Sequence, residues 1–291
     1  MKELDEKVKI SMDLHIHSHY SDSPFSIDQL FKIATMQGLS YIAIADHDTI
    51  KGINDIKKAV KNYDLKAIPA IEISAYSFSL NKKVHILAYG YHKAMPHTEK
   101  LCNILLERRT RHSIMQIEMI RKQGYKLDLD EVKKIAQHSA AIYKQHIMEA
   151  LLRNGYTQKV LSPLYDYFFK NNGICSKDMD YIDVHDVVKA VKMDGCMAVA
   201  AHPSKSSCLP VIEDLVKTGL DGLEINHPDH NESEQQMIRQ LADRYNLILT
   251  GGSDFHGRYG NPPFMGCCLA PCPELFLEKL SSISGPQSIL F

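Results

Sequence analysis

Histidine and carboxylate side chains gather near the start of this sequence. Residues 14–23 read LHIHSHYSDS, a stretch in which three histidines precede Asp22. Residues two apart on a β-strand point to the same face, so His15 and His17 would deliver two imidazoles to one place. Imidazole and carboxylate together are typical ligands of Zn, Mn or Fe, and are too rich in nitrogen for Mg or Ca alone.

Similar side chains follow other short apolar stretches along the chain. The candidate metal ligands are His15, His17, Asp22, His47, Glu72, His85, His202, Asp254 and His256. One ion takes about three or four protein ligands, whereas this set, with one bridging carboxylate, can serve three ions. Ions about 3.5–4 Å apart are typical of enzymes that act on phosphoryl groups.

Each candidate also has a purely structural interpretation. His85 or His202 alone would be a hydrogen-bonded core residue, and Glu72 alone would be a member of an ion pair. The stretch that contains His47 would also suit a helix N-cap. The functional interpretation rests on the whole set, because every predicted strand but one carries a histidine or an acid at its C-terminal end. Asp22 depends most on that argument, since it lies in a loop.

Seven segments rich in β-branched and apolar residues predict the strands that position these side chains. They are residues 11–18, 41–48, 65–74, 83–90, 196–203, 222–228 and 247–256. Such segments are typical of a parallel sheet buried on both faces. Helical patterns separate several of them, and Ser26 and Gln29 form a capping box for one helix that ends at Gly38. We therefore expect an α/β barrel of seven βα units, whose active face lies at the C-terminal ends of the strands.

The alternation of strands and helices stops between residues 97 and 190. This segment reads as helices joined by short polar stretches. Because strands resume after it, we predict a barrel in two parts, residues 1–96 and 191–291, with a helical insertion at 97–190 that covers the substrate.

The composition excludes some classes of partner. The chain has 291 residues, of which 24% are charged, and its net charge is −1. Without a net basic field, it is not expected to bind long duplex nucleic acid or an anionic membrane. The charged N-terminus lacks a hydrophobic signal region, and no apolar run is long enough to span a membrane. Seven cysteines without a CxxC motif favour reduced thiols and a cytoplasmic location.

An ordered set of motifs carries a resemblance to a known family. The motifs are DLHIHSHYSDS, IADHDT, PAIEIS, VHILAYG, AHPS and GGSDFHG, within residues 11–92 and 196–266. In this order they resemble the PHP (polymerase and histidinol phosphatase) superfamily. The insertion further resembles one branch, the nucleoside 3′,5′-bisphosphate phosphatases and 5′→3′ exonucleases of short oligoribonucleotides. The resemblance implies a distorted (β/α)7 barrel and a metal-dependent phosphoesterase.

The resemblance also implies how three divalent ions, Mn, Zn or Fe, would share the ligands. His15, His17, Glu72 and Asp254 would hold one ion; Glu72 would bridge to a second held by His85 and His202; Asp22, His47 and His256 would hold a third. Asp46 would orient an imidazole, whereas His19 matches no ligand position and is expected to face solvent. Glu72 and Asp254 are the expected catalytic residues, together with His227 as a candidate proton donor.

The expected substrate is a small phosphorylated nucleotide, above all a nucleoside 3′,5′-bisphosphate, with short 5′-phosphorylated RNA as a further candidate. The candidate substrate-binding residues are Arg108, Arg109, Arg111, Lys144, His146 and Lys205. His146 matches an Arg-Pro-His motif of the branch, but Lys144 and Gln145 replace its first two residues. AMP phosphatase, histidinol-phosphate phosphatase, amidohydrolase and a non-catalytic PHP binding module remain alternatives.

Overall fold

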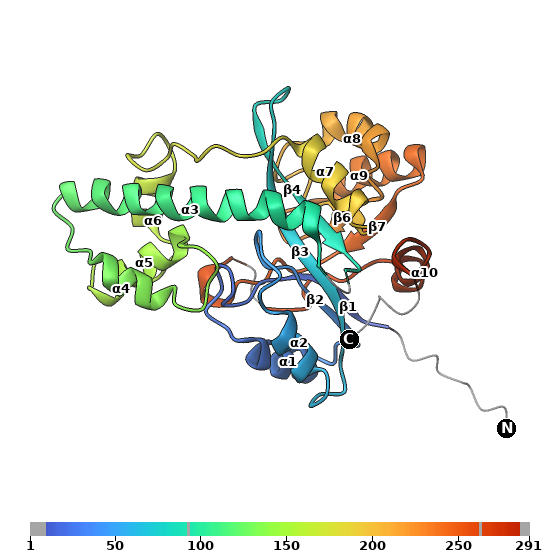
Figure 1. Ribbon diagram of the computed structural model, residues 1–291, viewed down its shortest axis with the longest axis horizontal. Helices are drawn as coiled ribbons and strands as arrows, with labels where there is room; N and C mark the ends of the chain where they lie inside the picture. The colour runs from blue at the N-terminus through green and yellow to red at the C-terminus, as the bar shows by residue number, and fades with distance from the viewer. Residues whose placement is uncertain (1–9, 92–93, 262–263, 286–291) are drawn as a thin grey trace.

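Seven strands form a mixed sheet that curls into a nearly closed barrel in this computed structural model, which describes residues 10–91, 94–261 and 264–285 (Figure 1). The strands are β1 (Met12–Ile16), β2 (Tyr41–Ile44), β3 (Lys66–Ser77), β4 (Lys82–Tyr89), β5 (Met197–Ala200), β6 (Gly222–Asn226) and β7 (Ile248–Gly251). They are hydrogen-bonded to one another in chain order. Ile16, the last residue of β1, also pairs with Phe255 after β7, which brings the two ends of the sheet together. The predicted seven-stranded α/β barrel is confirmed, whereas most of the charged N-terminal stretch lies outside the described residues.

The prediction of seven βα units is wrong at one place. β4 runs antiparallel to both β3 and β5, and the other neighbouring strands are parallel. A hairpin with Asn81 in the left-handed region, at φ 53°, joins β3 to β4 in place of a helix. Because β4 runs in the opposite direction, its first residues lie at the end of the barrel where the parallel strands finish. His85 therefore reaches the same end of the barrel as the other candidate ligands.

Helices cover the outside of the barrel. α1 (Ile27–Met36) and α2 (Ile53–Ala59) pack beside β1 and β2, and the predicted capping box of Ser26 and Gln29 is present at the start of α1. α8 (Ile212–Thr218) and α9 (Glu232–Tyr245) pack beside β5 and β6. α10 (Pro273–Ser284) contributes Phe276 and Leu280 to a further core that includes Tyr89 of β4.

Within the part of the chain that the structure describes, five helices lie between β4 and β5. They are α3 (Pro96–Lys122), α4 (Leu129–Ile135), α5 (Lys144–Arg153), α6 (Pro163–Phe169) and α7 (Val184–Met193). α3 begins on the barrel and extends far to its left in Figure 1. Its distal half shares an apolar core with α4, α5 and α6, whereas α7 returns to the barrel and packs on β3 and β4. The helices from the distal half of α3 to α6 are called the helical insertion below.

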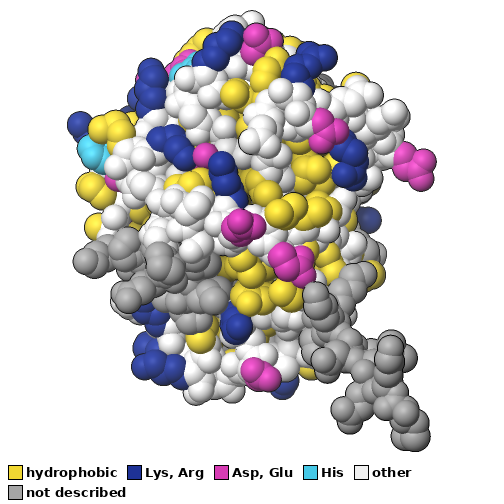
Figure 2. All heavy atoms as spheres, turned by 90° about the vertical axis from the view of Figure 1, so that its right-hand side faces the viewer, with side chains coloured by type: hydrophobic (Ala, Val, Ile, Leu, Met, Phe, Trp, Pro, Cys, Tyr) yellow, Lys and Arg dark blue, Asp and Glu magenta, His cyan; other side chains and the backbone are white. Residues whose placement is uncertain are grey.

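Among the described residues, none of the helices is long and apolar enough to cross a lipid bilayer. The face on the side of α9 and α10, away from the helical insertion, mixes hydrophobic with charged side chains and shows very few histidines (Figure 2). The seven cysteines are all free thiols, in agreement with the sequence-based expectation.

Candidate metal centre

The candidate ligands meet at the end of the barrel where the parallel strands finish. His15 and His17 come from the end of β1, His202 follows β5, and Asp254 and His256 follow β7. β3 is the longest strand and continues past the end of β2, so Glu72 lies beside His47 across an isolated β-bridge. The structure thus brings together side chains more than two hundred positions apart in the sequence.

Glu72 occupies the centre of this group, and its two oxygens face different histidines. Oε1 lies 2.8 Å from Nδ1 of His85 and 3.1 Å from Nε2 of His202. Oε2 lies 3.0–3.3 Å from nitrogens of three other imidazoles, those of His15, His17 and His47. A carboxylate that faces ligands on both oxygens has the geometry required of a bridge between two ions.

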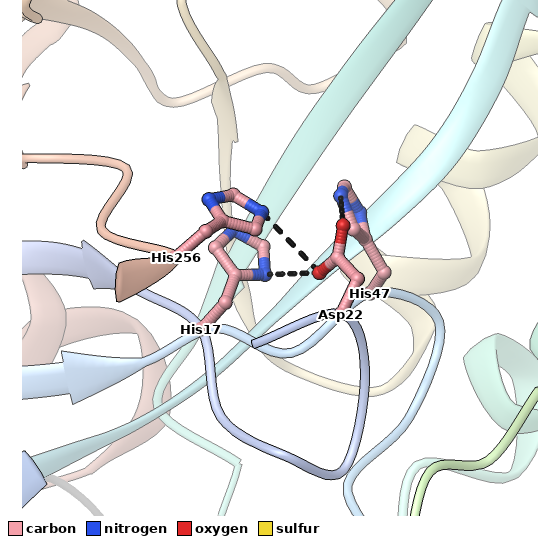
Figure 3. A group of neighbouring side chains, drawn as sticks. All are labelled: His17, Asp22, His47 and His256. Carbon is pink, nitrogen blue, oxygen red and sulfur yellow. Dashed lines mark ion pairs between the residues drawn. The ribbon is translucent and has the colours of Figure 1, made fainter. Parts of the chain in front are cut away.

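Two sets of potential ligands are compact enough to surround single ions. One set, the strand cluster, is His15, His17, Glu72 and Asp254, and the other, the loop cluster, is His17, Asp22, His47 and His256 (Figure 3). Within each set, one potential ligand atom per residue lies within 4.8 Å of the others. A third group contains His47, Glu72 and His85. These sets resemble the predicted division of ligands: His85 and His202 face the same oxygen of Glu72, and His47 is an additional neighbour of His85.

The polar atoms of these clusters are suited to a cation. Five potential ligand atoms are buried and have no hydrogen-bond partner: Nε2 of His15, Nε2 of His17, Oδ1 of Asp22, Nδ1 of His47 and Oε2 of Glu72. Burying such atoms without a partner is costly, and divalent cations commonly satisfy imidazole nitrogens and carboxylate oxygens together. The donor set therefore fits transition-metal ions at both clusters.

The carboxylates of the centre are held in their charged form. Burial by itself raises the pKa of Glu72, but the imidazoles of His47, His85 and His15 reverse this effect and hold it well below its usual range. Burial likewise raises the pKa of Asp254, and Lys205 and the neighbouring imidazoles lower it well below its usual range. Both carboxylates are therefore charged at neutral pH.

Two buried acids that the sequence analysis did not select hold the strands around the centre. Oε1 of Glu224, on β6, lies 3.0 Å from Nδ1 of His15, and its Oε2 accepts the backbone N–H of His202 at 2.8 Å. Asp13 accepts the backbone N–H of Ser253 at 2.9 Å and its hydroxyl at 2.6 Å. A carboxylate on the second nitrogen of a histidine fixes the ring and its tautomer, so that the other nitrogen is free to bind a metal. Glu224 stands in this relation to His15.

The loops of the centre include unusual backbone geometry. Asp48, His202 and Asp254 have φ values of 57°, 29° and 51°, in the left-handed region that non-glycine residues seldom adopt. At Gly252, an added Cβ would lie 2.3 Å from Cβ of His15, so only glycine allows β7 to approach β1 this closely. Such conformations are often found where a site must be held in one arrangement.

The structure departs from two expectations about neighbouring residues. Asp46 accepts the backbone N–H of Ser18 at 2.8 Å and the hydroxyls of Ser18 and Ser21 at 2.6 Å, so it organises the loop after β1 and reaches the imidazole of His17 only through the Ser21 hydroxyl, which lies 3.5 Å from Nδ1. His19 is half-buried and stacks on His138 of the helical insertion, with ring centroids 4.8 Å apart, so it does not simply face solvent. Sequence spacing could not show either contact.

His227 and Lys205 both contact Asp254. Nε2 of His227 lies 3.3 Å from Oδ2 of Asp254, and its Nδ1 accepts the backbone N–H of Asp229 at 3.0 Å. With Nδ1 occupied as an acceptor, Nε2 carries the proton and points it at Asp254. Lys205 bridges Asp254 and Asp229, with both contacts at 3.1 Å. Both residues thus contact a candidate ligand, while a role of His227 as proton donor and of Lys205 in anion binding stays a prediction.

The three arginines of α3 have different surroundings. Arg109 is half-buried, and its Nη2 donates to Asp48 at 2.8 Å and to Ser74 at 2.7 Å. Arg108 donates to the backbone carbonyl of Asp180 at 3.0 Å, and Arg111 is exposed. Arg109 is therefore occupied by the loop after β2, while a role of the other two in substrate binding stays a prediction.

The predicted basic residues of α5 also differ from one another. Lys144 lies 3.7 Å from Asp178, whose other oxygen pairs with Lys83 at 2.7 Å. His146 is buried, and its Nδ1 accepts the backbone N–H of Tyr143 at 3.1 Å. Burial lowers the pKa of His146 to about 4. His146 is thus neutral near pH 7 and caps its own helix, so Lys83, which the sequence analysis missed, is better placed to meet an anion.

A cavity of about 610 Å³ opens over the centre. It is lined on one side by candidate ligands such as Glu72, His85 and His256, and on the other by Lys83, Asp178 and the side chain of Gln145 from the helical insertion. This volume is in the range of sites for small organic ligands. The cavity therefore brings the potential metal site and the basic side chains within reach of one small substrate.

Comparison with known proteins places the chain in a family. A family model described as the PHP domain matches residues 13–157. A phosphoribosyl 1,2-cyclic phosphate 1,2-diphosphodiesterase of Eggerthella lenta is 38% identical, over 87% of this chain and 97% of that protein. The chain belongs to the PHP family. A 3′,5′-nucleoside bisphosphate phosphatase of Chromobacterium violaceum is a more distant PHP relative, 23% identical over 84% of this chain and 89% of its own length.

A solved structure agrees with this membership. A protein of Bifidobacterium adolescentis, described as a candidate metal-dependent phosphoesterase, superposes with a TM-score of 0.84 at 26% sequence identity. The match covers 93% of this chain and 95% of the other. The chain is therefore a metal-dependent phosphoesterase of the PHP family, with clusters of potential metal ligands that suit this activity. The resemblance seen in its motifs is confirmed.

Proposed function

We propose that this PHP enzyme hydrolyses small ribose phosphates that carry more than one phosphate group, and that a phosphoribosyl 1,2-cyclic phosphate is its preferred substrate. The observation that carries this proposal is the similarity to the Eggerthella lenta diphosphodiesterase, which spans nearly the whole of that protein. The nucleoside bisphosphate expected from the motifs has support from a more distant relative. We therefore place the cyclic sugar phosphate first and the bisphosphate second.

The main cavity offers separate places for two phosphate groups. One end is formed by the metal clusters, and the other contains Lys83, which pairs with Asp178. Lys144 approaches the same carboxylate from α5 and lines an adjoining cavity of about 220 Å³. Two lysines around one aspartate leave a net positive charge, which favours a phosphate that does not react. Such an anchor would hold the substrate while its other phosphate lies at the metal centre.

The residues of the centre suit hydrolysis of a phosphate ester. Bound divalent ions polarise phosphoryl oxygens and lower the pKa of water, so that an attacking nucleophile forms near neutral pH. The strand cluster and the loop cluster would hold these ions, with Glu72 shared between the strand cluster and the group that contains His85. Asp254 is kept charged and oriented by its contacts with Lys205 and His227. A fixed, charged ligand set needs little rearrangement during the reaction.

A nucleoside 3′,5′-bisphosphate remains the second candidate because an aromatic side chain faces the site. Tyr165 of α6 lines both the main cavity and the adjoining one. A tyrosine ring in this position can stack on a nucleobase, as aromatic side chains do in many nucleotide sites. A ribose phosphate without a base would not need this contact, so Tyr165 distinguishes the two candidates.

A parallel assay tests the proposal. Protein reconstituted with Mn²⁺ would be given phosphoribosyl 1,2-cyclic phosphate, a nucleoside 3′,5′-bisphosphate, AMP, a short 5′-phosphorylated RNA and histidinol phosphate. We expect the highest kcat/KM for the cyclic phosphate, because kcat/KM reports relative transition-state binding. A higher value for the bisphosphate, lost in Tyr165→Ala, would establish the second candidate instead. Failure to hydrolyse any of these compounds would favour the non-catalytic alternative.

The anchor for the second phosphate has its own test. Lys83→Ala and Lys144→Ala should lower kcat/KM for substrates with two phosphate groups by about 10-fold or more, which corresponds to one lost charge-assisted contact. Hydrolysis of a simple aryl phosphate should change much less. Lys122→Ala, which changes an exposed lysine at the end of α3, is the matched control. Parallel losses on both kinds of substrate would place the anchor elsewhere.

A further inference from the structure

The helical insertion contacts each of the three loops that carry the loop cluster of His17, Asp22, His47 and His256. In Figure 3, Asp22 lies between the imidazoles, with ion-pair contacts to His17, His47 and His256. All four residues lie beyond the ends of strands: His17 directly follows β1, and the other three lie in the loops after β1, β2 and β7. The residues that fix these loops come largely from α3 and from the segment leading into α5.

The loop that carries Asp22 is fastened at three points. Nε2 of Gln145 donates to Oδ2 of Asp22 at 2.8 Å. The Ser139 hydroxyl donates to the backbone carbonyl of Ser21 at 2.7 Å, and the backbone N–H of Ala140 donates to the carbonyl of Tyr20 at 2.9 Å. Because Gln145 occupies Oδ2, the other oxygen of Asp22 is left facing His256, at 3.2 Å.

The loop that carries His47 is fastened by two residues of the helices. The hydroxyl of Tyr143 donates to the backbone carbonyl of His47 at 3.0 Å. Arg109 of α3 donates to Asp48, the next residue, and its guanidinium lies 4.9 Å above the ring of Tyr143. Asp48 also accepts the backbone N–H of Ser74 at 2.7 Å. These contacts hold the loop in its left-handed conformation.

The loop that carries His256 is fastened by the residues that follow it. Arg258 donates to Glu149 of α5 at 2.7 Å. Tyr259 is buried in the apolar core that the helical insertion forms. The strand cluster differs in this respect. Within the described residues, no hydrogen bond or ion pair joins the side chains of its four members to the helical insertion, and His17 is the member that it shares with the loop cluster.

We infer that the helical insertion positions the loop cluster, with Gln145 and Tyr143 as positioning residues. Ion binding at the loop cluster then depends on the contacts that the helical insertion makes with its loops, whereas ion binding at the strand cluster does not. The inference rests on the proposed role of both clusters as ion sites. Gln145 is central to it, because its side chain touches a candidate ligand and lines the main cavity and two adjoining ones. Contacts that orient metal ligands are worth about 10- to 100-fold in metal affinity.

Metal titration of the full-length protein tests this inference. Chelator-treated wild type, Gln145→Ala and Tyr143→Phe would be titrated with Mn²⁺ by calorimetry, with free Mn²⁺ followed by electron paramagnetic resonance. Wild type should show at least two classes of site. In Gln145→Ala, one class should weaken by about 10- to 100-fold and the other should keep its affinity. Tyr143→Phe keeps the ring and loses only the hydroxyl contact, so it should weaken the same class by a smaller factor.

A control variant and the wild-type activity distinguish failure of the positioning role from failure of the proposed function. Gln137→Ala changes an exposed glutamine of the helical insertion, and it should bind Mn²⁺ as the wild type does. Unchanged binding in Gln145→Ala, or equal weakening of all classes, would overturn the positioning role while wild-type hydrolysis of phosphate esters would still support the proposed function. A wild type that binds no Mn²⁺ would overturn both.

Discussion

Glu224 provides a sharp test of how the barrel prepares the metal centre. Its side chain is fully buried, with one oxygen at 3.0 Å from Nδ1 of His15 and the other accepting the backbone N–H of His202 at 2.8 Å. Burial opposes the charge of Glu224, but His15 lowers its pKa below the usual range, so the carboxylate is charged. The substitution Glu224→Gln keeps the shape of the side chain and removes its charge.

The amide of this variant cannot satisfy both contacts. If its oxygen accepts from His202, its NH₂ group faces His15 and forces Nδ1 to accept, which puts the proton on the nitrogen needed for the metal. If its oxygen faces His15, two N–H donors oppose each other at His202. Either arrangement costs about 1–3 kcal/mol. We therefore expect metal affinity at the strand cluster to fall by about 10- to 100-fold, or about 1.4–2.8 kcal/mol.

Competition with a chelator measures this affinity, and urea unfolding of the metal-free protein measures the accompanying change in stability. Asp221→Asn is the control, because Asp221 also accepts a backbone N–H, that of Ala198 at 2.9 Å, and pairs with Lys192 away from the centre. It should lower stability without changing metal affinity. If Glu224→Gln binds Mn²⁺ as tightly as the wild type, then Glu224 is only a structural residue and the reasoning fails.

Three further predictions follow from individual contacts. The carboxylate of Glu72 contacts five histidines. Glu72→Gln should therefore lower kcat/KM by about 100-fold or more and reduce the number of bound ions measured by elemental analysis. Full activity in this variant would exclude a bridging role. Lys205→Met removes the cation that orients Asp254, so Mn²⁺ should bind about 10-fold more weakly in competition with a chelator, whereas unchanged or tighter Mn²⁺ binding would contradict this account. Burial lowers the pKa of His146 from 6.5 to about 4, so the stability that the neutral ring contributes is present above pH 6.5 and is lost as the pH falls toward 4. Relative to His146→Gln, the wild type should lose about 2 kcal/mol of unfolding free energy between pH 7 and pH 5 in urea titrations. Equal losses in the two proteins would refute the shift.

The strands and most of the candidate ligands could be predicted from sequence because both follow local patterns. Each strand is a short, nearly continuous apolar stretch, and the observed strands lie within the predicted ones or close to their bounds. The pair His15 and His17 is visible from spacing alone, since alternate residues of a strand share a face. The capping box at Ser26 likewise needs only residues three apart, and it is present as predicted.

The direction of β4 and the supporting residues depend on contacts that local patterns do not encode. A buried antiparallel strand has the same apolar character as a buried parallel one, so periodicity could not show that β4 turns back along β3. Glu224 appears in sequence only as an acid within an apolar stretch, and its partner His15 is 209 positions away. An acid in a buried strand is nevertheless a signal, because such a charge requires a partner.

The three arginines of α3 illustrate the same limit. Arg108, Arg109 and Arg111 look equivalent as a basic group on one helix. Burial alone separates Arg109, which reaches Asp48, from Arg111, which is exposed. Tertiary packing decides which of the three arginines is buried. The sequence alone therefore cannot show whether a charged cluster binds substrate or stabilises the fold.

If Gln145 and Lys144 have the roles proposed above, the helical insertion would link substrate choice to metal binding. Gln145 and Lys144 are neighbours on α5, yet one contacts the candidate ligand Asp22 and the other faces the proposed phosphate anchor at Asp178. A shift of α5 that accommodates a different substrate would move both side chains, because successive residues of a helix move together. Substitutions in this helix would therefore alter ion affinity along with specificity. Differences in substrate preference among such proteins should accordingly be compared only after the metal content of each has been measured.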